Sequence, residues 1–130
     1  MKIVVGYDGS KAADDAIKIA QKHAKAFEAE VYVLTFLEHR PLLKTETIDQ
    51  AKSKLEKLKK AFTENAIACE VNASVSYMSP GENLVKFAKE NDADEVIIGV
   101  RKRSPVGKAV FGSTAQYVIL NSPCSVTAAK

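Results

Sequence analysis

The chain has 130 residues, 46% of them hydrophobic, and a net charge of +3 at neutral pH. This length suits one domain, residues 1–130, with a core large enough to need no disulfide or metal, and the composition excludes a disordered chain. The weak positive charge excludes a protein built mainly to coat nucleic acid, and no apolar run reaches the roughly 18 residues of a membrane span. The opening residues do not form a signal peptide, so we expect a cytoplasmic protein.

Short apolar runs alternate with helical patterns from one end of the chain to the other. The first run, KIVVGY, is rich in β-branched residues, and Ser10 behind it is placed to cap a helix in which Ala13, Ile17 and Ala20 recur at helical spacing. The expected strands cover residues 2–7, 31–37, 69–77, 95–99 and 124–128, and the expected helices cover residues 11–27, 46–65, 82–91 and 114–121. This alternation predicts βαβ units with right-handed crossovers and a mostly parallel sheet with helices on both faces.

The carboxyl ends of the strands are where a ligand is expected, at the point where the strand order reverses. Three segments therefore matter: residues 8–10, residues 36–38 and the loop that starts at Gly99. That loop, GVRKRSPVGKAVFGST, contains three consecutive cations and leads into a helix at Thr114. Free N–H groups at a helix start favour an anion, and the hydroxyls of Ser113 and Thr114 with the nearby cations add to this. The alternative is that Ser113 or Thr114 merely caps the helix while the cations are solvated.

Two phosphate-binding motifs are excluded by the spacing. Gly107-Lys108 is followed by Ala109 rather than by Ser or Thr, which excludes a P-loop. The turn after the first strand lacks the G-x-G-x-x-G pattern of a dinucleotide site.

The sequence offers no catalytic residue and no metal site. We interpret His23 and His39 as surface histidines, and Ser10 as a helix cap rather than a nucleophile, because no catalytic partner stands at the required spacing. Cys69 and Cys124 lack the spacing of a zinc site and are expected to be buried as small apolar residues.

Four stretches of the chain resemble the universal stress protein family, and the resemblance covers essentially the full length. They are the opening IVVGYDGS, the strand VYVLTFLE, the strand VIIG and the stretch FGSTAQYVILNSPCSV. Members of the family that bind ATP show the pattern G-x2-G-x9-G-[S/T] after the fourth strand. Gly99 and Gly112-Ser113 match this pattern, whereas Lys102 stands at the second glycine, within a variant R-K-R-S-P-x-G-K loop.

The resemblance implies a fold and a ligand. The fold would be a three-layer α/β sandwich of the Rossmann-like, adenine nucleotide alpha hydrolase type, with a five-stranded parallel sheet in the order 3-2-1-4-5. The ligand would be ATP or AMP, with Mg²⁺ bridging the phosphates and no metal ligand from protein side chains. By position, the nucleotide-binding residues would be Asp8 at the adenosine end, the main chain of Phe36 at the adenine edge, Gly99 against the ribose, Arg101 and Lys102 as cations, and Gly112, Ser113 and Thr114 at the phosphates.

Three functions stay open on the sequence. The first is a nucleotide-binding stress-response or signalling module in which hydrolysis is slow or absent, because no group is placed to activate water. The second is a nucleotide-independent dimeric interaction protein, favoured by Lys102 and Pro105 where the glycine pattern breaks. The third, nucleic-acid binding through residues 101–103, is disfavoured because a few cations make few phosphate contacts.

The resemblance also implies a homodimer. Family members pair through the last strand, here CSVTA, and an edge strand offers unpaired backbone groups to a second chain. Ser125 and Thr127 replace the usual apolar side chains in this strand.

Overall fold

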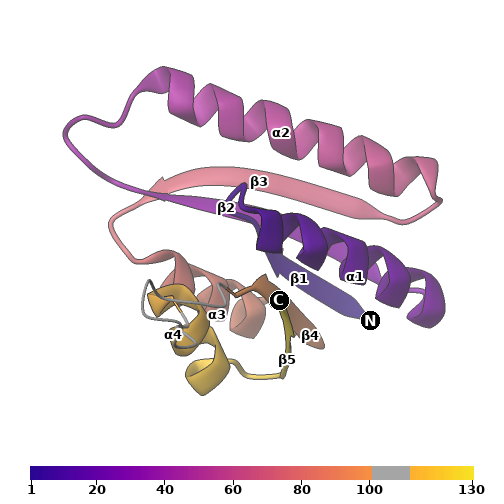
Figure 1. Cartoon of the computed structure of the whole chain (residues 1–130). Helices are drawn as coiled ribbons and strands as arrows, with labels where there is room; N and C mark the ends of the chain where they lie inside the picture. Colours follow the sequence, from indigo (N-terminus) through magenta and orange to yellow (C-terminus); the bar gives the residue numbers. More distant parts are fainter. Residues whose placement is uncertain (101–111) are drawn as a thin grey trace.

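A computed structural model of the chain, which describes residues 1–100 and 112–130, contains a five-stranded sheet covered by helices (Figure 1). The elements are β1 (Lys2–Gly6), α1 (Lys11–Phe27), β2 (Glu30–Glu38), α2 (Thr45–Glu64), β3 (Cys69–Ser76), α3 (Pro80–Glu90), β4 (Glu95–Gly99), α4 (Ser113–Asn121) and β5 (Ser125–Ala129). All strand pairs are parallel and the order is β3-β2-β1-β4-β5, which confirms the predicted fold class and strand order. Within the described ranges, no helix is long and apolar enough to cross a bilayer.

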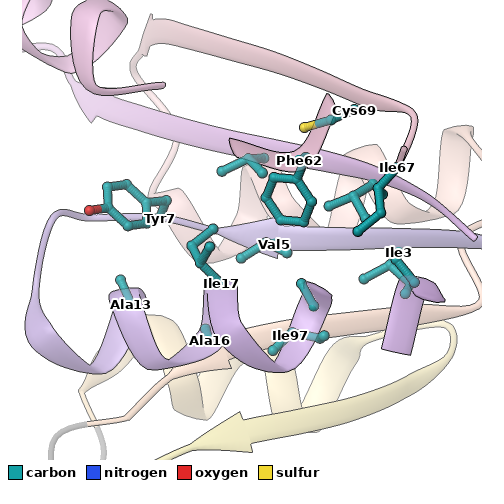
Figure 2. Packing of buried hydrophobic residues seen from close by; sticks show 14 of the residues in the cluster. Ile3, Val5, Tyr7, Ala13, Ala16, Ile17, Phe62, Ile67, Cys69 and Ile97 are labelled. Atoms are coloured by element: carbon teal, nitrogen blue, oxygen red, sulfur yellow. The ribbon is translucent and has the colours of Figure 1, made fainter. Parts of the chain in front are cut away.

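Two hydrophobic cores lie on opposite faces of the sheet. On one face, Ile3 and Val5 of β1 pack beneath α1 and α2, which contribute Ile17 and Phe62 (Figure 2). On the other face, Val4 packs with residues of α3 and α4. Because neighbouring residues of a strand point to opposite faces, a strand buried on both sides must be apolar at every position. This explains the unbroken apolar run at the start of the chain.

Helix starts follow local capping signals. The Ser10 Oγ accepts a hydrogen bond from Ala13 N at 3.1 Å, which confirms the predicted cap of α1. In α3, the Ser79 Oγ accepts from Glu82 N at 3.2 Å. Pro80 occupies the first turn, where an N–H group would have no acceptor within the helix. The helix therefore begins at Pro80 rather than at the predicted Glu82.

Replacing Ser10 with alanine is expected to lower the free energy of unfolding by about 1 kcal/mol, because the first turn of α1 would lose its side-chain acceptor. Urea denaturation followed by circular dichroism measures the change. Ser53 is an exposed residue inside α2, so Ser53→Ala is the matched control and should leave stability nearly unchanged. Equal losses in the two variants would contradict the capping role.

β2 and β3 run past the end of β1. β2 pairs with β3 as far as Glu38 and Ser76, whereas the last β1 partner of β2 is Gly6, opposite Leu34. Continued pairing with β3 also explains why β2 extends beyond its predicted end at Leu37. The carboxyl edge of the sheet therefore has a step, and the final residues of β2 stand beyond β1.

Two interpretations from the sequence are wrong. His23 is half-buried rather than a plain surface residue, and its Nδ1 lies 2.9 Å from Oε1 of Glu95, a residue only 7% exposed. Thr127 of β5 donates to the other carboxylate oxygen, Oε2, at 2.5 Å. A buried carboxylate requires such partners, and the register of β4 and β5 beneath α1 brings them together.

The second wrong interpretation concerns Cys124, which is half-buried rather than buried. Cys69 is buried as predicted, and burial raises the pKa of its thiol to about 11.

Candidate functional site

A cavity of about 290 Å³ opens at the carboxyl ends of β1, β2 and β4. It is lined by Gly6, Tyr7 and Asp8 after β1, by Leu34, Thr35, Phe36 and Leu37 of β2, by Pro80 and Leu84 of α3, by Ile98 and Gly99 of β4, and by Thr114 of α4. β1 lies between β2 and β4, so this is where the strand order reverses. Parallel α/β sheets bind their ligands at such a point.

A wider hollow of about 530 Å³ lies at the opposite end of the strands, where β1 and β2 begin. It is lined by residues at the amino ends of β1 and β2, including Lys2 and Glu30, and by the loop before β3. It is more open than the cavity at the carboxyl ends, and it does not lie where such sheets bind ligands. We therefore take the smaller cavity as the candidate site.

The cavity brings together part of the predicted residue set. Asp8, Phe36, Gly99 and Thr114 all line it. Gly112 and Ser113 precede Thr114 at the exposed start of α4. The predicted cations Arg101 and Lys102 lie outside the described residues.

The turn that carries Asp8 is held by hydrogen bonds at both of its ends. The Asp8 Oδ1 accepts from Ser10 N at 2.9 Å, and Gly9 between them has a φ of 82°, a conformation that favours glycine. On the other side of Asp8, the Tyr7 hydroxyl donates to Asp14 Oδ1 at 2.6 Å. Burial raises the pKa of Tyr7, and the bond to Asp14 raises it further, so the phenol stays a neutral donor. The turn thus presents Asp8 to the cavity in a fixed position.

The main chain of Phe36 faces the space beyond the end of β1. Leu34 O accepts from Tyr7 N at 2.9 Å, so the main-chain groups of Leu34 point toward β1. Groups of alternate residues point to the same side of a strand, and Phe36 follows two positions later, past the last β1 partner. The Tyr7 carbonyl is already engaged by the Thr35 hydroxyl at 2.8 Å. A donor and an acceptor of Phe36 are therefore turned toward the cavity.

The start of α4 differs from the starts of α1 and α3. Gly112 is its N-cap, with φ −62° and ψ 162°, and no described side chain caps the first turn. The alternative in which Ser113 or Thr114 is the cap is therefore wrong. N–H groups that no described side chain caps, together with the helix dipole, make this end of α4 attractive to an anion.

Gly81 positions α4 beside the cavity. A Cβ at Gly81 would lie 3.1 Å from Tyr117 Cβ and 3.3 Å from Thr114 O, so the glycine allows α3 and α4 to approach closely. Thr114 and Pro80, from the first turns of the two helices, consequently line the same cavity.

Gly99, which lines the cavity, is required by packing. A Cβ there would lie 2.5 Å from the carbonyl carbon of Ala12 and 2.7 Å from Ala13 N. The missing side chain therefore makes room for the first turn of α1 against β4. The resemblance had suggested only a contact with ribose.

Several cavity residues were missed by the sequence analysis. Thr35 interrupts an apolar strand, and Pro80 begins a helix shortly after a strand; both were signals of the carboxyl edge. Leu84 belongs to the apolar stripe of α3 and gave no signal, because it has the same spacing as a core residue.

Comparisons with known proteins support the same family as the motifs. Residues 1–130 match the family model described as the universal stress protein family. A universal stress protein of Thermus aquaticus is 30% identical over 129 residues, which is 95% of this chain and 94% of the relative. The structure of a universal stress protein from Archaeoglobus fulgidus is similar with a TM-score of 0.89 at 35% identity, covering 100% of this chain and 98% of that chain. A universal stress protein structure from Archaeoglobus fulgidus in complex with dAMP has a TM-score of 0.83 at 30% identity, with the same coverage of 100% and 98%.

Proposed function

Because the chain belongs to the universal stress protein family, we propose that its cavity binds an adenine nucleotide, ATP or AMP, and that the protein is a cytoplasmic stress-response or signalling module. The observation that supports this best is the convergence of Asp8, the main chain of Phe36 and the first turn of α4 on one cavity. The dAMP held by the Archaeoglobus relative supports the choice of an adenine nucleotide.

The adenine is proposed to lie at the β2 side of the cavity. The N–H and C=O of Phe36 offer one donor and one acceptor to a base edge, and Leu37 and Leu84 provide apolar surface around the base. Asp8 would contact the adenosine end, and Gly99 would lie against the ribose.

The phosphates are proposed to lie at the start of α4. The N–H groups of residues 112–114 and the hydroxyls of Ser113 and Thr114 would donate to phosphate oxygens. Arg101 and Lys102 would add positive charge, with the Lys102 ammonium replacing a backbone contact. Mg²⁺, when present, would bridge the phosphates.

Hydrolysis is proposed to be slow or absent. Asp8 is the one carboxylate among the described residues that line the cavity, and its Oδ1 accepts from Ser10 N. It is assigned to the adenosine end, away from the phosphates that water would attack. Fast hydrolysis needs a group that orients or deprotonates water at the γ-phosphate.

The proposal is tested by analysing the nucleotide content of the protein. Freshly purified protein is denatured and its supernatant is examined by chromatography, and the analysis is repeated after incubation with Mg-ATP and desalting. We expect a near-stoichiometric amount of adenine nucleotide. No nucleotide, even after incubation, would contradict the assignment and favour a nucleotide-independent protein.

Among the described strands, β5 lies at the edge of the sheet, and this position supports a second role, a homodimeric interaction module. Val100 N donates to Ala129 O at 2.8 Å, so the main chain of Ala129 faces β4 and that of Ala128 faces away from the sheet. The neighbouring helix α4 exposes Leu120, whose exposed fraction is 81%. Backbone groups that no described strand pairs, together with an exposed apolar side chain on α4, suit pairing with a second copy of the chain.

Ala128→Pro is expected to weaken dimerisation about tenfold or more while the fold persists. Proline removes the outward N–H of Ala128 and leaves the bonds to β4 intact, which is tolerated on an edge strand. Ala128→Val keeps the N–H and is the matched control. Sedimentation velocity over a range of concentrations measures the change, and a dimer that persists unaltered in Ala128→Pro would exclude this edge as the interface.

A further inference from the structure

The end of β1 and the middle of α3 meet in an unusually close contact. Gly6 is the last residue of β1, and a Cβ placed there would lie 2.6 Å from Leu84 Cδ1 and 3.3 Å from Leu84 Cδ2. The Leu84 side chain therefore occupies the space that any side chain at position 6 would fill. Both residues line the candidate cavity.

Leu84 separates this cavity from a close-packed core. It is only 2% exposed and belongs to the cluster that includes Val85, Ile98 and Val118. Packed cores have little free volume, so a displaced Leu84 side chain has its nearest open space in the cavity. Leu84 thus forms a wall whose position depends on the absence of a side chain at Gly6.

We propose that Leu84, held over Gly6, sets the depth of the cavity and makes it select adenine nucleotides with an unsubstituted base over nucleotides that carry a bulky group on the base. This inference rests on the proposed adenine site and names the feature that limits ligand size there. The wall is an aliphatic side chain, so it discriminates by volume and offers no hydrogen bond to the ligand.

The contact predicts that substitutions at Gly6 and at Leu84 change the size of the cavity in opposite directions. Gly6→Ala pushes Leu84 into the cavity and is expected to weaken AMP binding about tenfold. Adding Leu84→Ala to this variant removes the obstruction, so the double variant should regain AMP affinity. Leu84→Ala alone deepens the cavity and admits a larger base.

The experiment measures the affinities of AMP and of three AMP analogues, benzylated at N6, C2 or C8, by isothermal titration calorimetry. In Leu84→Ala, the affinity of at least one analogue relative to AMP is expected to rise about tenfold or more. Val85→Ala is the matched control, because Val85 is a buried neighbour on α3 that does not line the cavity. It should lose stability without any change in this ratio. If Leu84→Ala does not fold, Leu84→Val provides the same test with a smaller cavity change.

The outcomes separate this inference from the proposed function. The size limit is supported if the affinity of an analogue relative to AMP rises in the Leu84 variants and does not rise in Val85→Ala. AMP binding with an unchanged ratio for all three analogues would overturn the size limit and leave the nucleotide site standing. Failure of the unmodified protein to bind AMP or ATP would overturn both.

Discussion

Gly112→Glu is expected to abolish nucleotide binding and to leave the protein folded. The backbone of Gly112 has φ −62°, which every residue adopts, and no described heavy atom lies within 4 Å of the position of its Cβ. A carboxylate at a helix start is even favourable for the helix. The same carboxylate would face the proposed phosphates, and like charges brought together cost several kcal/mol, or about a hundredfold or more in affinity.

Two matched variants isolate the charge. Gly112→Gln has nearly the same size as the glutamate variant, and Gly112→Ala tests the loss of glycine alone; both should bind ATP within about tenfold of the unmodified protein. Calorimetry with Mg-ATP measures affinity, and circular dichroism checks the fold. Retained affinity in Gly112→Glu would remove the start of α4 from the phosphate site.

The overall fold was predictable because its signals are local. Apolar runs such as residues 2–7 and 95–99 alternate with helical stripes, and each crossover must be right-handed. The boundaries were less predictable where pairing decides them: β2 reaches Glu38 only because β3 continues beside it to Ser76. The strand ends also placed Asp8, Phe36 and Gly99 at the cavity, since carboxyl ends of parallel strands meet at one edge, and the expected helix start after the loop placed Thr114 there.

The remaining features depend on contacts between distant segments. His23 and Glu95 are 72 positions apart, and only the packing of α1 on β4 brings the imidazole to the carboxylate. Leu84 has the spacing of a core residue, and its place at the cavity depends on the absence of a side chain at Gly6 of β1. Neither relation has a signature in the sequence around these residues.

Gly99→Ala is expected to lower the free energy of unfolding by about 1–3 kcal/mol, in contrast to Gly112→Ala, which should leave it almost unchanged. Both glycines match the family pattern, but their surroundings differ. A Cβ at Gly99 would lie 2.5 Å from the Ala12 carbonyl carbon, a main-chain atom that moves only if the whole first turn of α1 moves. Displacing that turn would also shift Asp8 at the cavity, because the Asp8 carboxylate accepts from Ser10 N, at the N-cap of α1.

Urea denaturation of the two alanine variants measures this contrast. Equal stabilities would show that α1 adapts to a methyl group at position 99. Packing against α1 would then not require a glycine there. A loss confined to Gly99→Ala, together with weaker nucleotide binding, would mean that the first glycine of the motif acts by positioning α1 and the Asp8 turn. Gly112 would act by leaving the start of α4 open to phosphate. The two glycines of one sequence motif would then meet two separate physical requirements.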